Sequence, residues 1–312
     1  MRAVTVGDGR VEVHDRPEPV PGPGQLLVRV RAAGLNAADL AQLAGGYPAP
    51  PGWPQDVPGI ELAGEVVALG DRVTRFGVGA RVMGLVGGGA QAQLAVVNEG
   101  EAMVVPPGLG WDAAGGLPEA YVTAHDALVT QVGLGRGERL LVTGAAGGVG
   151  TAAVQLAAAL GATVVASVRD EARRPAVASL GATAVDPSEV AAHGPFDVIL
   201  ELVGLASLDA VLPCLAADGR VSLIGGGVRA TIDLGPLMMR RGRLFGSTLR
   251  GRSEAEKADA VAGVSTDVLP LVADGKLRVP VDSTYPLVDA AEAYEHFVRG
   301  RKFGKVVLTV ED

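Results

Sequence analysis

A glycine-rich segment, Leu140 to Gly150, has the residue types and spacing of a dinucleotide-binding turn. Its sequence, LLVTGAAGGVG, sets Ala145, Gly147 and Gly150 after an apolar run, and an alanine-rich stretch follows. Bare backbone lets a pyrophosphate reach N–H groups at a helix N-terminus, where the helix dipole favours an anion. A tight strand-to-helix turn without a ligand is the alternative. The expected cofactor contacts of the turn are Ala146, Gly147, Gly148, Val149 and Gly150.

The tip of the next strand indicates which nicotinamide cofactor fits. NAD sites carry Asp or Glu there, about 20 residues beyond the glycine turn. Here we expect the strand to end on Val168, with Arg169 directly after it, and Asp170 to start the next helix. Arg169, Arg173 and Arg174 can form a planar, charge-assisted fork for a 2′-phosphate, or an ordinary solvated helix face. The sequence favours NADPH, with Ser167, Arg169 and Arg173 as contacts.

Alternating strands and helices must position this turn. From Arg139 to Ile224 apolar strands alternate with helical segments, which predicts an α/β doubly wound parallel sheet. The stretch from Leu140 to Val168 has no charged residue and is long enough to suggest a membrane span. Its glycines divide it instead into a strand, a turn, a helix and a second strand.

The segments on either side have a different pattern. Short β-rich runs separated by proline and glycine, from Gln25–Ala33 to Gln93–Val97, predict an antiparallel, barrel-like domain. Asn36–Ala44 has helical character. One helix is predicted over Ser253–Ala273, because Ser253 and Glu256 have the spacing of a capping box.

Composition limits the classes of partner. A chain of 312 residues is long enough to form two domains. Its 35 acidic and 27 basic residues give a net charge of −8. This charge argues against nucleic acid or an anionic membrane as a partner. Cys214 is the single cysteine, which excludes an internal disulfide and suits a reducing compartment. The first residues lack the apolar core of a signal peptide, so we expect a cytoplasmic protein.

With these segments in place, the chain resembles the zinc-independent quinone oxidoreductase branch of the medium-chain dehydrogenase/reductase family. Besides the glycine motif, the resemblance rests on Gly34–Pro48, Pro58–Leu85, Leu117–Leu128 and Phe303–Val310. It implies a GroES-like β-rich catalytic domain over 1–112 and 250–312, a Rossmann NADPH-binding domain over 113–249, and an active site in the cleft. It also implies a homodimer, paired through edge strands around Val221–Ile224 or Arg243–Leu249.

The resemblance also identifies what the zinc-dependent relatives have and this chain lacks. Those relatives place a cysteine at Asn36 and a His-Glu pair at Ile60 and Glu61, and they carry a four-cysteine loop. Zinc prefers Cys, His or carboxylate ligands. We therefore expect no zinc, and a structural hydrogen-bonding role for Glu61.

By the same resemblance, Asn36 and Tyr47 face the substrate as catalytic residues; a helix cap and a loop anchor are the alternatives. Trp53 is a further pocket candidate, because aromatics are only 4% of the chain and Trp53 shares the proline-rich loop Gly45–Pro58 with Tyr47. That loop can equally be an inert connection. The remaining expected cofactor contacts are Thr123, Gly225, Gly226, Phe245 and Ser247.

The resulting hypothesis is an NADPH-dependent reductase that passes hydride to a quinone or an α,β-unsaturated carbonyl. The protein would then stabilise the developing oxyanion through Tyr47, Asn36 and backbone N–H groups, with the proton from Tyr47 or water. Two alternatives stay open: a 2-enoyl thioester reductase acting in trans in polyketide or fatty-acid synthesis, and a non-catalytic, crystallin-like NADPH-binding protein.

Overall fold

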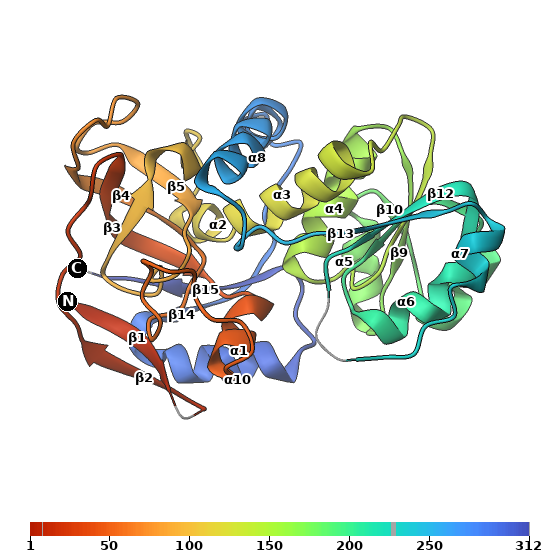
Figure 1. The fold of residues 1–312 in the computed structure, drawn as a ribbon, viewed down its shortest axis with the longest axis horizontal. Helices are drawn as coiled ribbons and strands as arrows, with labels where there is room; N and C mark the ends of the chain where they lie inside the picture. The colour runs from red at the N-terminus through yellow and green to blue at the C-terminus, as the bar shows by residue number, and fades with distance from the viewer. Residues whose placement is uncertain (8, 226–228, 312) are drawn as a thin grey trace. The chain divides into compact units, whose positions relative to one another are not determined.

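The computed structural model describes residues 1–7, 9–225 and 229–311, and these form two compact units (Figure 1). Unit 1 comprises Met1–Val122 and Leu249–Asp312, and unit 2 comprises Thr123–Thr248. The chain therefore enters unit 2 once and leaves it once, and both of its ends belong to unit 1.

Unit 2 is built on a six-stranded sheet in which every neighbouring pair is parallel. The strand order is β10-β9-β8-β11-β12-β13. Counted from β8, this is the order 3-2-1-4-5-6 of a dinucleotide-binding sheet, which confirms the predicted doubly wound fold. The strands are β8 (Arg139–Val142), β9 (Thr163–Ser167), β10 (Ala182–Val185), β11 (Phe196–Glu201), β12 (Leu215–Leu223) and β13 (Arg243–Gly246).

Helices pack on this sheet because its strands are apolar on both faces. Leu141, Val165, Phe196 and Ile199 are among the buried side chains of its core. The uncharged stretch from Leu140 to Val168 forms β8, a helix and β9, and no described helix combines the length and apolarity that a membrane span needs. The helices are α4 (Gly148–Ala159), α5 (Arg174–Ala178), α6 (Leu205–Val211) and α7 (Gly235–Met239).

Unit 1 contains a seven-stranded sheet and a separate β1–β2 hairpin. The sheet order is β14-β15-β3-β4-β5-β7, and β6 also pairs with β3; the pairs are antiparallel except β14–β15. The strands are β1 (Arg2–Gly7), β2 (Arg10–Asp15), β3 (Gln25–Gly34), β4 (Glu61–Leu69), β5 (Arg81–Leu85), β6 (Leu94–Asn98), β7 (Ala102–Val104), β14 (Val281–Pro286) and β15 (Lys305–Thr309).

The helices of unit 1 cover its strands, and α10 packs against β2, β14 and β15 (Figure 1). The predicted capping box is confirmed, since Glu256 N–H donates to Ser253 Oγ at 3.3 Å and Ser253 N–H donates to Glu256 Oε2 at 2.9 Å. The prediction of a single helix over 253–273 is wrong, because the helix is interrupted at Val268. Pro270 lacks the N–H that a continuous helix would need there. The helices are α1 (Ala37–Leu43), α2 (Trp111–Gly115), α8 (Glu254–Asp267), α9 (Leu269–Ala273) and α10 (Ala290–Arg299); α3 (Pro118–His125) begins in unit 1 and ends in unit 2.

A buried carboxylate, Asp39, fixes the start of α1. Its Oδ2 accepts Asn36 N–H at 2.8 Å, and its Oδ1 accepts Gly59 N–H at 3.0 Å. Burial raises the pKa of Asp39 from 3.8 to about 6, although both backbone donors act to lower it. The folded protein therefore holds the Asp39 proton more tightly than the unfolded chain does.

This linkage predicts a specific pH dependence of stability. The contribution of protonated Asp39 is complete below pH 3.8 and is lost as the pH rises through about 6. A shift of this size corresponds to about 3 kcal/mol at most. Between pH 4 and pH 7 the free energy of unfolding in urea should fall more in the wild type than in Asp39→Asn, which has no such titration. Parallel pH curves for the two proteins would contradict the prediction.

Candidate functional site

The glycine turn lies at the carboxyl end of β8, where the strand order of unit 2 reverses between β8 and β11. Gly144 has φ of +60°, and Gly147 is the N-cap of α4. A Cβ on Gly150 would lie 2.5 Å from the carbonyl oxygen of Gly144 and 2.6 Å from Cα of Ala145. Gly150 must therefore be bare for α4 to start this close to the strand.

This close approach exposes a set of donors that fits a dinucleotide pyrophosphate. The first N–H groups of a helix have no intrahelical acceptor, and the helix dipole makes that end positive. Gly148, Val149 and Gly150 form the first turn of α4, which is 12 residues long. These backbone groups can hold the pyrophosphate of NADPH, so the residues present fit the cofactor that the sequence predicts.

The three arginines of the expected fork follow β9, and they have different surroundings in the structure. Arg169 is exposed just beyond β9, and Arg173 Nε lies 3.9 Å from Asp170 Oδ2. Arg174 is used elsewhere, because its Nη2 donates to Asp186 Oδ2 at 2.5 Å and its Nε donates to the Val168 carbonyl. The structure therefore removes Arg174 from the fork and leaves Arg169 and Arg173 as candidates for a 2′-phosphate.

Two further expectations concern the same strand tip. Asp170 starts the next turn as expected, because its Oδ1 accepts Ala172 N–H at 3.1 Å. Ser167 is buried at the end of β9, and its carbonyl accepts Ala145 N–H at 3.4 Å. The backbone of Ser167 thus braces the glycine turn.

The end of β11 contains an acid that sequence reasoning missed. Glu201 is fully buried, and its carboxylate accepts Val203 N–H at 2.6 Å, Gly204 N–H at 2.9 Å and Ser207 Oγ–H at 2.9 Å. A Cβ on Gly225 would lie 2.5 Å from the Leu202 carbonyl oxygen. The signal for Glu201 is an acid that ends the strand FDVILE directly after three apolar residues.

The other expected cofactor residues lie on different elements. Thr123 is buried in α3, Phe245 is half-buried in β13, and Gly226 lies outside the described residues. Ser247 Oγ accepts from Gln131 Nε2 at 2.6 Å and donates to Asp126 Oδ2 at 3.3 Å. Asp126 and Gln131 belong to a π-helical segment, Asp126–Gln131, which the sequence did not predict.

In unit 1 a buried polar network surrounds Glu61. Lys305 Nζ donates to Glu61 Oε1 at 2.6 Å, to Asn36 Oδ1 at 2.7 Å and to the Leu35 carbonyl at 2.9 Å. Asn36 Nδ2 donates to Glu61 Oε1 at 2.9 Å and to the Gly34 carbonyl at 3.3 Å. Both amide hydrogens of Asn36 therefore have protein acceptors, and a contact of this side chain with substrate stays a prediction.

The side chains of this network are unsuited as ligands of a zinc ion. An ammonium lies 2.6 Å from the Glu61 carboxylate, the residue before it is the apolar Ile60, and Asn36 offers an amide. Among residues 1–7, 9–225 and 229–311, no group of three or more His, Cys, Asp or Glu side chains is arranged to hold a metal ion. Glu61 has the structural role expected of it, since Oε2 also accepts Glu119 N–H at 2.8 Å.

Tyr47 and Trp53 are held by residues that sequence reasoning did not single out. Arg250 donates from Nη1 to the Tyr47 carbonyl at 2.8 Å, and its guanidinium carbon lies 5.1 Å from the centroid of the Tyr47 ring. Trp53 packs on Gly87, where a Cβ would lie 2.5 Å from Trp53 Cδ1. No local pattern marks Arg250, because its partners are remote in sequence.

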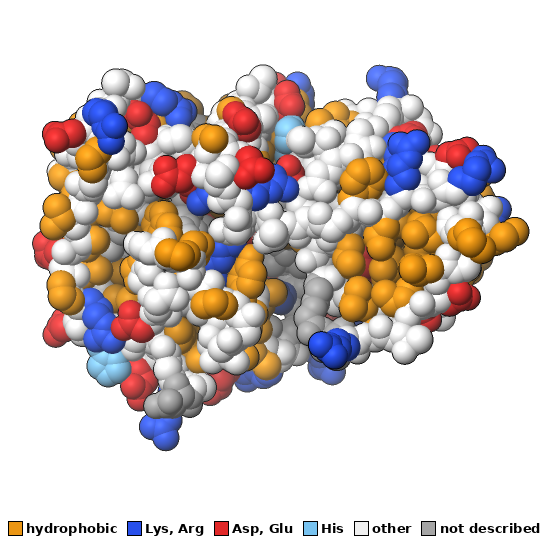
Figure 2. Space-filling view, viewed as in Figure 1, with side chains coloured by type: hydrophobic (Ala, Val, Ile, Leu, Met, Phe, Trp, Pro, Cys, Tyr) orange, Lys and Arg blue, Asp and Glu red, His pale blue; other side chains and the backbone are white. Residues whose placement is uncertain are grey.

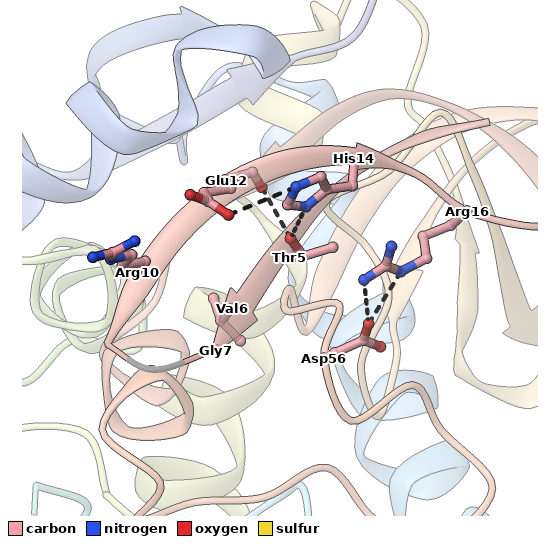
Figure 3. A pocket seen from close by; sticks show the side chains of 8 residues that line it. All are labelled: Thr5, Val6, Gly7, Arg10, Glu12, His14, Arg16 and Asp56. Atoms are coloured by element: carbon pink, nitrogen blue, oxygen red, sulfur yellow. Dashed lines mark hydrogen bonds and ion pairs between the residues drawn. The ribbon is translucent and has the colours of Figure 1, made fainter.

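A surface pocket of about 430 Å³ lies on the β1–β2 hairpin and contains none of the expected site residues (Figure 3). Four of its polar side chains bond in pairs: Arg16 Nη2 donates to Asp56 Oδ2 at 2.8 Å, and Thr5 Oγ1 lies 2.7 Å from His14 Nδ1. A hollow lined mostly by charged and polar side chains is unsuited to a flat apolar acceptor, so we assign it no role in the chemistry.

Known proteins match this chain over nearly all of its length. Family models match at residues 22–133, for an alcohol dehydrogenase GroES-like domain, and at residues 160–308, for a zinc-binding dehydrogenase. A quinone oxidoreductase of Pseudomonas aeruginosa is 30% identical, and the match covers 96% of this chain and 95% of that protein. The structure of mycobacterial Rv1454c complexed with NADPH is 26% identical with a TM-score of 0.87, covering 99% of this chain and 100% of that chain.

A second kind of relative is much longer than this chain. The polyketide synthase GfsB of Streptomyces halstedii is 34% identical, and the match covers 92% of this chain but only 5% of that synthase. The full-length matches, the GroES-like domain and the parallel sheet of unit 2 agree with one another. The chain belongs to the quinone oxidoreductase branch of the medium-chain dehydrogenase/reductase family and is an oxidoreductase.

Proposed function

We propose that the protein is an NADPH-dependent, zinc-independent reductase that transfers hydride to a quinone or an α,β-unsaturated carbonyl. NADPH supplies the hydride when it is bound. The chain's own residues bind and orient the cofactor, orient the acceptor, and stabilise the negative charge that grows on the acceptor oxygen.

The bonding of Glu61 is the observation that carries this proposal. Its Oε1 accepts from Lys305 and Asn36, and its Oε2 accepts from the Glu119 backbone. A carboxylate with these partners is a poor zinc ligand, so metal-assisted alcohol oxidation fits the chain badly. For hydride transfer to an electron-poor acceptor, the protein needs to supply only hydrogen-bond donors to the acceptor oxygen and no metal ion. Such acceptors are therefore favoured.

On the cofactor side, the turn Ala146–Gly150 would bind the pyrophosphate. Arg169 and Arg173 would bind the 2′-phosphate, since a guanidinium pairs with phosphate oxygens through short charge-assisted bonds. Thr123, Gly225 and Ser247 would lie along the nicotinamide half. The likeness to mycobacterial Rv1454c, whose structure is a complex with NADPH, supports the choice of cofactor.

On the acceptor side, Tyr47 is the donor that we propose for the developing oxyanion. It is half-buried in the loop that also carries Trp53. Asn36 would act as a positioning residue rather than a donor, because its amide hydrogens already bond to Glu61 and Gly34. The proton that completes reduction would come from Tyr47 or water.

A 2-enoyl thioester reductase is the second candidate, and the match to a segment of a polyketide synthase favours it. The reaction is the same hydride transfer to a polarised double bond. Only the acceptor differs, because a thioester carries a long acyl arm. A panel of acceptors therefore separates the two candidates.

We also propose a homodimer formed through β13. Within the described residues β13 pairs with β12 alone, so its second edge offers unpaired backbone groups. Leu244 is 41% exposed on this strand, and Met238 and Met239 of α7 are more than 70% exposed, at 73% and 74%. Figure 2 shows apolar side chains gathered on the face of unit 2 that carries α6 and α7. Pairing through Val221–Ile224 is wrong, because β12 lies inside the sheet.

The first prediction from this proposed function concerns Tyr47. Tyr47→Phe should lower kcat/KM about 10²-fold for quinones and enones, because it removes one donor to the oxyanion. NADPH oxidation is measured against quinones, enones and enoyl thioesters, and NADPH binding is measured by titration. Tyr285→Phe is the matched control, since Tyr285 Oη lies 3.1 Å from His296 Nδ1 and has no proposed part in catalysis.

Each outcome of this panel has a clear consequence. Preference for enoyl thioesters would support the second candidate. NADPH binding without turnover of any acceptor would contradict both candidates and favour a non-catalytic NADPH-binding protein. Unchanged turnover of every acceptor in the Tyr47→Phe, Asn36→Ala double variant would show that these two residues do not carry catalysis.

The second prediction concerns cofactor choice. Arg169→Ala with Arg173→Ala should weaken NADPH binding at least about tenfold and leave NADH binding unchanged, because only NADPH carries the 2′-phosphate. Calorimetric titration with each nucleotide measures both affinities. Arg240→Ala is the control, since Arg240 is also an exposed arginine of unit 2. Equal losses for NADPH and NADH would count against the assignment.

The third prediction concerns the dimer. Leu244→Lys places a charge on the free edge of β13 and should shift a dimer to monomer in analytical ultracentrifugation, with the fold retained by circular dichroism. Val298→Lys is the control, because Val298 is 66% exposed on α10 of unit 1. A Leu244→Lys dimer as stable as wild type would rule out the β13 interface.

A further inference from the structure

The guanidinium of Arg250 joins three separate segments of unit 1. Nε donates to the Gly87 carbonyl at 2.9 Å, Nη1 to the Tyr47 carbonyl at 2.8 Å and Nη2 to Gln42 Oε1 at 2.6 Å. Gly87 follows β5, Tyr47 lies in the proline-rich loop and Gln42 is in α1. The residues it joins are up to 208 positions away in the chain.

A second set of hydrogen bonds continues from Gln42 along the loop. Gln42 Nε2 donates to the Gln55 carbonyl at 2.9 Å. Gln55 Nε2 in turn donates to the Trp53 carbonyl at 2.9 Å and the Ala49 carbonyl at 3.1 Å. Arg250, Gln42 and Gln55 therefore tie down the loop near its start, at its middle and at its end.

The composition of the loop explains why it needs these donors. Gly45–Pro58 reads GGYPAPPGWPQDVP, and each proline lacks an N–H. The segment forms no regular helix or strand, so its carbonyls have few backbone donors available. Arg250 and Gln42 from outside the loop, and Gln55 within it, supply side-chain donors instead.

Burying the charged guanidinium of Arg250 costs desolvation free energy, so a gain in stability does not explain why the residue is there. The residue is 7% exposed, and its three partner oxygens are neutral. Burial lowers the pKa of the guanidinium, which remains charged at neutral pH. A buried cation bonded to neutral oxygens is weak evidence for a stabilising role and points to a positional one.

We infer that Arg250 is a positioning residue that orders the loop Gly45–Pro58 and so fixes Tyr47 and Trp53 for the acceptor. Arg250 acts on the reaction through Tyr47, whose ring it faces at 5.1 Å. A lysine carries its three N–H donors on one atom, whereas the bonds of Arg250 leave from three nitrogens of a planar fork, so lysine does not reproduce their geometry. This inference rests on the proposed function for its kinetic consequence, but the ordering of the loop is independent of it.

The first experiment measures how well the loop is ordered and does not depend on enzyme activity. Trp53 and Trp111 are the only tryptophans, so Trp111→Phe leaves Trp53 as the single reporter in the full chain. In this background Arg250→Met and Arg250→Lys should shift Trp53 emission to longer wavelength and raise its quenching by acrylamide. Arg220→Lys is the matched control: Arg220 is a 16% exposed arginine that bonds to Glu138 and the Val132 carbonyl in unit 2. It should leave Trp53 emission unchanged.

The second experiment measures the kinetic constants for the acceptor and the affinity for NADPH. Arg250→Met should raise KM for the acceptor about 10- to 100-fold, as expected for a misplaced binding group, and leave the Kd for NADPH unchanged. In the Tyr47→Phe background the same change should have a much smaller effect on kcat/KM, because Arg250 acts through Tyr47. Gln42→Leu, which removes the acceptor of Nη2 and the link to Gln55, should reproduce both effects in milder form if Arg250→Met fails to fold.

The outcomes distinguish this inference from the proposed function. Wild-type Trp53 quenching and acceptor KM in both Arg250→Lys and Gln42→Leu would overturn the inference. Additive effects of Arg250→Met and Tyr47→Phe would overturn action through Tyr47. If Tyr47→Phe has no effect on any acceptor while Trp53 loses its protection in the Arg250 variants, the proposed role of Tyr47 fails and the ordering of the loop stands.

Discussion

The buried bond between Lys305 and Glu61 is the interaction on which unit 1 depends. It joins the first residue of β15 to the first residue of β4, at 2.6 Å. Burying two charges costs several kcal/mol for each ion, and hydrogen bonds must offset this cost. Three oxygens accept from the ammonium, and Glu61 Oε2 accepts Glu119 N–H at the start of α3. One carboxylate thereby sets the positions of two strands, a helix start and Asn36.

Glycines make this network and the glycine turn of unit 2 possible for the same physical reason. A Cβ on Gly34 would lie 2.9 Å from Glu61 Cδ, and a Cβ on Gly150 would lie 2.5 Å from a carbonyl oxygen. Gly87 is bare beneath the ring of Trp53. Part of the count of 45 glycines is therefore explained by close approaches that position charged or aromatic groups, in addition to turns.

The sequence predicted those features whose determinants are local. The glycine turn, the alternation of strand and helix and the cap at Ser253 all depend on neighbours a few residues apart. Arg174 was one of three arginines that could form the fork for a 2′-phosphate; its partner Asp186 becomes adjacent only when β9 and β10 pair. Lys305 and Glu61 are 244 residues apart, and Arg250 and Gln42 are 208 apart. No spacing rule reaches such pairs, so the network and the loop support required the structure.

The glycine turn of unit 2 and the loop Gly45–Pro58 of unit 1 are held in place by different means. In unit 2 the free N–H groups at the start of α4 are backbone groups, whose positions are fixed by strand order and by Gly150. In unit 1 the loop Gly45–Pro58 is fixed by side chains of Arg250, Gln42 and Gln55. Backbone donors survive most substitutions, whereas side-chain donors are lost by a single one. A single substitution in unit 1 can therefore loosen the loop Gly45–Pro58 while the glycine turn of unit 2 keeps its geometry.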